Sequence, residues 1–167
     1  MPSPRRVVLG LGANLGDRAA TLRAAIDALR ADADLRIVAE SSRYETPPAG
    51  GPPQPDYLNA AVLVTTALPS REILDRALAI ERALGRVRPD PVRWGPRTID
   101  IDLLWAEGEI LHEPGLDVPH PRLPERPFAL RPLLDVAPDA ADPRTGEPYA
   151  TLPAASAPIR RVDPASG

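Results

Sequence analysis

The chain has 167 residues, of which 43 % are apolar, and carries a formal net charge of −3. This composition suits a single globular domain with a sizeable core and argues against a nucleic-acid footprint over the whole surface. The chain contains no cysteine and no lysine, which excludes disulfides, thiolate metal sites, cysteine nucleophiles and a Walker-type phosphate loop. No apolar run approaches the ~20 residues that span a bilayer, and the N-terminus lacks the apolar region of a signal peptide. We therefore expect a cytoplasmic protein with no membrane contact.

The first third of the chain predicts a strand, a helix and a second strand. The run RRVVLGLGA (5–13) is typical of a buried strand that ends in glycine turns. Apolar residues then recur at helical spacing up to Arg30, and Asp17 is a suitable N-cap. Residues 35–46 predict a strand, and five prolines and two glycines in 47–55 predict a surface loop.

The middle of the chain repeats this pattern. Residues 57–68 predict a strand, and Ser70 can cap a helix that runs to about Leu84 and ends at Gly85. A second loop (86–96) leads into a strand over 98–106. A short strand around Glu109–Leu111 follows.

Residues 128–138 predict a short helix interrupted by Pro132, and residues 153–167 lack periodicity and are expected to form a tail. The order β-α-β-β-α-β is typical of an α+β, ferredoxin-like fold with a mainly antiparallel sheet. We expect one domain over 1–167 with a core of about residues 5–138, the C-terminal elements being additions.

Two aspartates stand out in the strand 98–105. Alternation places Asp100 and Asp102 on one face with Leu104, and Ile99, Ile101, Leu103 and Trp105 on the other. Carboxylates this close repel each other, and a divalent cation offsets that repulsion. Mg²⁺ takes carboxylate oxygens together with substrate phosphates and water. The alternative is a simply solvated face, since a lone DxD is a weak motif.

The loop before this strand is rich in arginine, with Arg86, Arg88, Arg93 and Arg97. Arginine binds phosphate bidentately, so arginines next to paired carboxylates indicate phosphoryl transfer. The alternative is a solvated basic loop.

Further polar residues flank the other loops. Thr46-Pro47, Tyr57 and Asn59 bracket the proline loop, and an amide can pair with the edge of a heterocycle. Taken by themselves, these residues favour ordinary packing and turn roles. GLGANLG has the spacing GxGxxxG, which is not the dinucleotide fingerprint. The two histidines, His112 and His120, show no zinc-site spacing. His120 lies near Arg126 in a loop that can close over an anion or remain a plain surface loop.

These residues carry a resemblance. RWGPRTIDIDLLW (93–105) resembles the signature of the 6-hydroxymethyl-7,8-dihydropterin pyrophosphokinase family, and WGPRTxDxD is highly specific to it. LGLGANLGDR, SSRYETPP, PDYLNAAV, IERALGRVR and VPHPRLPERPFALRPL agree in order and spacing, so that the match covers about residues 6–138. The resemblance implies transfer of pyrophosphate from ATP to the pterin hydroxymethyl group in folate biosynthesis, with release of AMP.

The resemblance also implies roles for residues of this chain. Two Mg²⁺ ions would be bound by Asp100 and Asp102, and Asp102 is the candidate to accept the hydroxyl proton. A pterin pocket would comprise Asn14, Thr46, Pro47, Tyr57, Asn59, Trp94 and Phe128. ATP would contact Glu81, Arg86, Arg88, Arg97, Ile99, His120 and Arg126, with Arg86, Arg88 and Arg97 also acting in catalysis.

Ala49, Gly115 and Pro121 depart from the usual family pattern, which bears on ATP affinity and loop closure. Two other classes stay open. A Mg²⁺-dependent phosphohydrolase would need no acceptor. An RNA-binding module could use the same scaffold, although this chain has few aromatic residues for base stacking. We expect a monomer that binds small molecules and no nucleic acid.

Overall fold

The computed structural model describes residues 3–48, 51–86 and 98–162. Its elements, in chain order, are β1 (Arg5–Ala13), α1 (Arg18–Arg30), β2 (Arg36–Glu40), β3 (Arg43–Thr46), β4 (Tyr57–Thr66), α2 (Ser70–Ala83), β5 (Asp100–Ala106), β6 (Leu111–Glu113), β7 (Leu116–Val118), α3 (Pro127–Val136) and β8 (Arg160–Val162). Short 3₁₀ turns lie at Leu123–Glu125, Tyr149–Thr151 and Pro153–Ser156.

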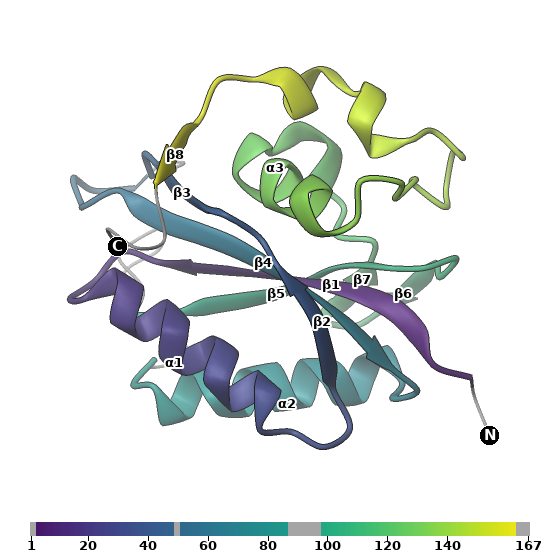
Figure 1. The fold of residues 1–167 in the computed structure, drawn as a ribbon, viewed down its shortest axis with the longest axis horizontal. Coiled ribbons are helices and arrows are strands. Elements are labelled where there is room, and N and C mark those ends of the chain that lie inside the picture. The colour runs from purple at the N-terminus through teal and green to yellow at the C-terminus, as the bar shows by residue number, and fades with distance from the viewer. Residues whose placement is uncertain (1–2, 49–50, 87–97, 163–167) are drawn as a thin grey trace.

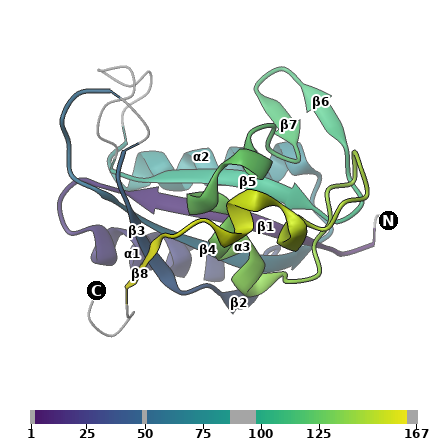
Figure 2. The same cartoon turned by 90° about the horizontal axis from the view of Figure 1, so that it is seen from above.

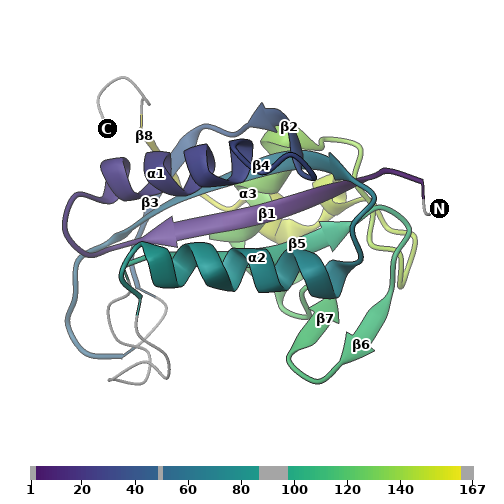
Figure 3. The same ribbon diagram turned by 90° about the horizontal axis from the view of Figure 1, so that it is seen from below.

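The main sheet has the order β5-β1-β4-β3-β8, with β2 also paired to β4, and all of its strand pairs are antiparallel. Helices α1 and α2 cover one face of the sheet, and α3 with the C-terminal turns covers the other (Figure 1). Figure 3 shows α1 and α2 lying side by side across their face. The predicted α+β, ferredoxin-like class is therefore confirmed.

Each face of the sheet buries its own apolar cluster. Leu22, Ile26, Ile73 and Ile99 belong to the cluster under α1 and α2, whereas Val8, Leu104 and Leu130 belong to the cluster under α3. Trp105 also lies on the α3 face, so its predicted grouping with Ile99 is wrong. The cause is a β-bulge in the pairing of β1 with β5, where Val8 pairs with Trp105 but Leu9 pairs with Leu103.

The second predicted strand is broken in two. Ser41 interrupts it: its hydroxyl accepts a hydrogen bond from the Ala61 backbone N–H at 2.8 Å and so takes the place of a regular ladder contact. As a result, β2 pairs with the far half of β4, and β3 pairs with its first residues.

The predicted N-cap is correct for α1 and wrong for α2. Asp17 caps α1, accepting from the Ala20 N–H at 3.0 Å. Ser70 is the first residue of α2 rather than its cap, and its hydroxyl donates to Glu109 at 2.6 Å. Gly85 follows α2 with a φ of 97°, a conformation that glycine adopts without steric strain.

The C-terminal third is more ordered than expected. The helix over 127–136 is continuous through Pro132, and the expected short strand lies two residues later and pairs with β7, which was not predicted. The expected tail contributes a 3₁₀ turn and strand β8, which pairs with the free edge of β3. Viewed from above, this segment crosses α3 before reaching β3 (Figure 2). None of the helices in the described ranges is long and apolar enough to cross a bilayer.

Candidate active site

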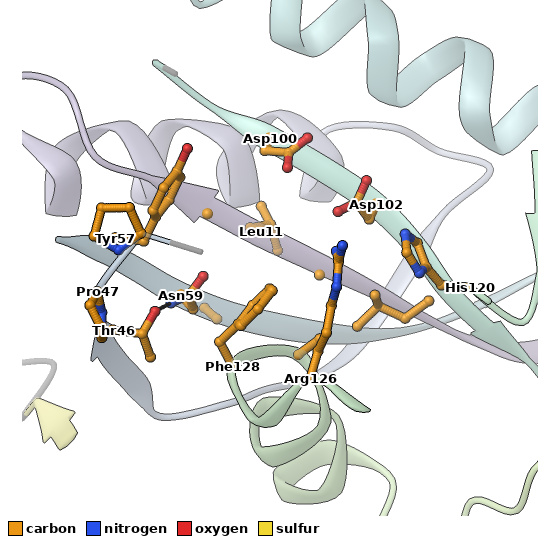
Figure 4. A pocket seen from close by; sticks show the side chains of 16 residues that line it. Leu11, Thr46, Pro47, Tyr57, Asn59, Asp100, Asp102, His120, Arg126 and Phe128 are labelled. Atoms are coloured by element: carbon orange, nitrogen blue, oxygen red, sulfur yellow. Dashed lines mark hydrogen bonds between the residues drawn. The ribbon is translucent and has the colours of Figure 1, made fainter. Parts of the chain in front are cut away.

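A cavity of about 260 Å³ opens on the α3 face of the sheet, over β1 and between β5, the ends of β3 and β4, and the start of α3. It brings together nine residues that the sequence analysis singled out: Thr46, Pro47, Tyr57, Asn59, Asp100, Asp102, His120, Arg126 and Phe128. Figure 4 shows the two aspartates along β5, with the proline-loop residues at the other end of the cavity. The cavity thus has an acidic edge, formed by Asp100 and Asp102, and a ring end that suits a flat aromatic ligand. The ring end is formed by Thr46, Pro47, Tyr57, Asn59 and Phe128.

The acidic edge is built by strand alternation. Asp100 and Asp102 project from β5 to the cavity, while Ile101 between them is buried in the opposite layer. On the neighbouring strand, Gly12 pairs with Asp100 and Gly10 pairs with Asp102. Bare backbone therefore lies beside each carboxylate, and other lining side chains pack closely over it: an added Cβ would lie 2.8 Å from Leu104 at Gly10 and 3.1 Å from Asn59 Oδ1 at Gly12.

These glycines were not predicted to belong to the site. The same holds for five further lining residues, Leu11, Pro48, Ala60, Leu104 and Ala129. The signal for the glycines was present. The GLG of the rejected dinucleotide pattern places Gly10 and Gly12 two apart, and therefore on one face of β1. Apolar lining residues carry no comparable signal, because their pattern is that of any buried strand.

Arg86 lies in the interior rather than on an exposed part of its loop. Its side chain is 4 % exposed and its Nη1 lies 2.9 Å from Asp100 Oδ1 and 3.2 Å from Glu81 Oε2. The alternative of a solvated basic loop therefore does not hold for Arg86, because two carboxylates draw the guanidinium inward.

Glu81 is equally buried and lies behind β5, outside the cavity lining. Its Oε2 accepts from the Ile101 backbone N–H at 2.7 Å. The Ile99 side chain is in the core under α2, and its carbonyl accepts from Arg86 at 3.3 Å. Glu81 and Arg86 together brace the strand that presents both aspartates.

The ring end of the cavity is organised by one buried hydrogen bond. Asn59 Nδ2 donates to Thr46 Oγ1 at 2.7 Å, shown as a dashed line in Figure 4. Thr46 pairs with Tyr57 across β3 and β4, and the ring of Phe128 reaches into the cavity from α3. An oriented amide between aromatic walls is the arrangement that binds a flat heterocycle.

Asn14 supports this end from outside the cavity lining. Its Nδ2 donates to Gln54 Oε1 at 2.8 Å and to the Pro55 carbonyl at 3.0 Å. Asn14 therefore ties the proline loop to the turn after β1.

Arg126 and His120 lie across the cavity from the proline loop. Arg126 extends toward Asp102 and His120 (Figure 4), and its guanidinium lies 5.5 Å from the centre of the Phe128 ring. Burial and the neighbouring Arg122 lower the pKa of Arg126. Burial and Arg126 lower the pKa of His120 below its usual value. An anion bound here would offset the repulsion between Arg126 and Arg122.

The predicted site residues Arg88, Trp94 and Arg97, and the departure at Ala49, lie outside the described residues. Within the described ranges, no group of three or more His, Cys, Asp and Glu residues could hold a metal ion. Asp100 and Asp102 fit Mg²⁺ nonetheless, because this ion is commonly held by one or two carboxylates with substrate phosphates and water.

The α+β fold carries paired aspartates, nearby arginines and a pocket for a flat heterocycle on one face of an antiparallel sheet. This combination is typical of an enzyme of phosphoryl transfer. Residues 8–138 match the family described as 7,8-dihydro-6-hydroxymethylpterin-pyrophosphokinase. The chain belongs to this family.

Curated relatives are similar over most of their length. The 2-amino-4-hydroxy-6-hydroxymethyldihydropteridine pyrophosphokinase of Methylorubrum extorquens is 48 % identical over 134 residues, which cover 80 % of this chain and 84 % of the relative. The protein of the same name from Bacillus subtilis is 44 % identical, covering 77 % and 75 %.

A solved structure, Plasmodium falciparum HPPK-DHPS with pteroate, has a TM-score of 0.67 at 16 % identity. It covers 89 % of this chain, which spans 42 % of that longer chain. This likeness supports the fold.

Proposed function

We propose that the chain transfers pyrophosphate from ATP to the hydroxymethyl oxygen of 6-hydroxymethyl-7,8-dihydropterin, giving AMP and the pterin diphosphate, a step of folate synthesis. One observation carries the proposal: the Asn59–Thr46 pair and the two aspartates line the same cavity. A pterin ring held against Asn59 can direct its hydroxymethyl group toward the acidic edge. Attack of that oxygen on the β-phosphorus forms one P–O bond and breaks the bond to the AMP oxygen.

Mg²⁺ belongs to this proposal, with two ions expected at Asp100 and Asp102. When bound, the ions would neutralise the phosphate charge that develops in the reaction. Arg86 holds Asp100 at 2.9 Å, so this carboxylate is already oriented before a ligand arrives. The reaction needs no strong base. Asp102 is the proposed acceptor of the hydroxyl proton.

The remaining residues bind and position the substrates. His120 and Arg126 are proposed to contact the ATP phosphates, an assignment supported by their place across the cavity from Asn59. Phe128 and Tyr57 would exclude water from the pterin ring. Arg88, Arg97 and Trp94 are proposed to complete the site, the arginines at the phosphates and Trp94 over the pterin.

We further infer a cytoplasmic monomer that binds small molecules and no nucleic acid. The net charge of −3 is unfavourable for binding a polyanion. Size-exclusion chromatography with light scattering tests the monomer.

The test of the reaction is product analysis. The purified chain is incubated with ATP and Mg²⁺, with and without 6-hydroxymethyl-7,8-dihydropterin. The nucleotides and pterins are then separated by chromatography, and identified and quantified by mass spectrometry. The proposal expects AMP and pterin diphosphate in equal amounts, and only with the pterin present. Release of phosphate or pyrophosphate without an acceptor would identify a phosphohydrolase. RNA binding that weakens steeply with salt, in place of turnover, would identify an RNA-binding module.

A further inference from the structure

Glu45 on β3 joins three parts of the molecule that surround the ring end of the cavity. Its Oε2 lies 2.8 Å from Arg18 Nη2 at the start of α1, and its Oε1 lies 3.3 Å from Arg160 Nη1 on β8. The other Arg18 nitrogen, Nη1, donates to the Asp56 carbonyl at 2.9 Å. One carboxylate therefore links α1 and β8, and through Arg18 it also reaches the end of the proline loop.

Glu45 acts from the side of the sheet opposite the cavity. Its neighbours in sequence, Tyr44 and Thr46, are buried, and Thr46 lines the cavity. In the ladder, Glu45 pairs with Leu58 of β4 and with Arg160 of β8. The residues that flank Leu58, namely Tyr57 and Asn59, also line the cavity. A shift of Glu45 along β3 would thus change the distance between Thr46 and Asn59.

These contacts hold the end of the proline loop next to α1 and β3. Thr46 precedes the loop, and the Asp56 carbonyl held by Arg18 comes directly before Tyr57. Asn14 holds the same end of the loop through hydrogen bonds to Gln54 and Pro55. Strand β8 covers the outer edge of β3, which would otherwise present unpaired backbone groups.

We propose that Glu45 is a positioning residue for the pterin end of the site, and that β8 takes part in it through Arg160. The inference rests on the proposed function. Glu45 touches no substrate. It fixes the end of β3 against α1 and β8, so that the Thr46 hydroxyl and the Asn59 amide keep the spacing that a pterin edge requires.

The geometry separates this group from an ordinary surface ion pair, which contributes little to stability. The Glu45 and Arg18 side chains are only 20 % and 29 % exposed. Arg18 contacts two segments through different nitrogens, Glu45 on β3 and the Asp56 carbonyl before β4. Loss of the charge should therefore loosen the local register more than it lowers the stability of the whole domain.

The experiment uses the full chain and the variant Glu45→Gln, which keeps the shape and removes the charge. Binding of 6-hydroxymethylpterin and of a non-hydrolysable ATP analogue with Mg²⁺ is measured separately by calorimetry, beside thermal unfolding. The pterin Kd should rise roughly three- to tenfold, as the loss of up to two ion pairs implies, while the nucleotide Kd stays within about twofold. Arg160→Gln, which removes one exposed partner, should give a smaller change in the same direction.

The matched control is Glu109→Gln. Glu109 also has two partners, Arg5 and Ser70, and is 25 % exposed, but it lies beyond the opposite end of β5 from Asp100. It should change neither Kd. If Glu45→Gln behaves like Glu109→Gln, or weakens both ligands equally, the positioning role is overturned. Failure of the wild-type chain to form AMP with pterin would instead overturn the proposed function, and this inference with it.

Discussion

The side-chain amide of Asn59 donates to the hydroxyl of Thr46 at 2.7 Å, joining the first residues of β4 to the last residue of β3 at one end of the cavity. This bond uses Nδ2 and sets the direction of Oδ1, which faces Gly12 on the next strand. A pterin edge would therefore meet an amide whose orientation is fixed before binding.

Replacing Asn59 by alanine should weaken pterin binding much more than nucleotide binding. A buried polar group of the ligand left without its partner costs about 1–3 kcal/mol. Calorimetric titration of each ligand alone checks the expectation. Thr46→Val, which removes only the orienting acceptor, should weaken the pterin in the same direction by a smaller amount. An equal loss for both ligands would make Asn59 a purely structural residue.

Adding a methyl group at Gly12 should also weaken pterin binding. An added Cβ would lie 3.1 Å from Asn59 Oδ1 and 3.5 Å from a ring carbon of Tyr57. The first distance is tight, so the amide of Asn59 would have to move. We expect Gly12→Ala to raise the pterin KM about tenfold, equivalent to roughly 1.4 kcal/mol, with thermal stability nearly unchanged. An unaltered pterin KM would show that Asn59 yields without loss of binding.

The acidic edge should determine turnover. Asp102→Asn keeps the size of the side chain and removes its charge, so kcat should fall at least about a hundredfold, or roughly 3 kcal/mol of transition-state stabilisation. Circular dichroism should show an intact fold. Glu107→Gln serves as the control, because Glu107 directly follows β5 but pairs with Arg6, outside the cavity lining. Retention of kcat within about tenfold in Asp102→Asn would exclude a metal-binding role.

Glu81 should prove to be a stability residue. It is 1 % exposed and holds both the Ile101 N–H and Arg86. Glu81→Ala leaves Arg86 with one carboxylate fewer in the interior, and removing one partner of a buried pair costs about 3–5 kcal/mol of unfolding free energy. Urea unfolding followed by fluorescence measures the difference. Glu81→Gln, which retains an acceptor for Ile101, should lose less. A stable Glu81→Ala protein with poor nucleotide binding would restore a direct role at the nucleotide.

The sequence predicted the parts of the fold that local pattern controls. The strand 5–13 and the cap at Asp17 follow from alternation and from side-chain chemistry close in sequence. The site followed partly as well, since Asp100 and Asp102 must share a face. What could not be predicted depends on contacts distant in sequence. The break at Ser41 requires the Ala61 N–H, the inward turn of Arg86 requires Glu81 and Asp100, and β8 requires the open edge of β3.

Alkaline pH should destabilise the protein through its tyrosines. Tyr44 is 3 % exposed and its hydroxyl donates to Asp135 at 2.7 Å. Burial, with the Asp135 carboxylate second, raises the pKa of Tyr44 to about 12, against about 10 in the unfolded chain. Burial also raises the pKa of Tyr149. The chain has no lysine or cysteine to titrate in the same range.

The sign of the effect follows from these values. The native state keeps the Tyr44 proton where the unfolded state loses it, so this contribution to stability is fully present below about pH 10. It declines above that pH by up to about 1.4 kcal/mol per unit for one proton and is lost as the pH passes the folded pKa. Urea unfolding from pH 8 to 12 should show the decline, and tyrosinate absorbance should show delayed ionisation in the native state. Tyr44→Phe should be less stable at pH 8, having lost a hydrogen bond, yet should lose less with rising pH. Parallel curves for the two proteins would contradict the assignment to Tyr44.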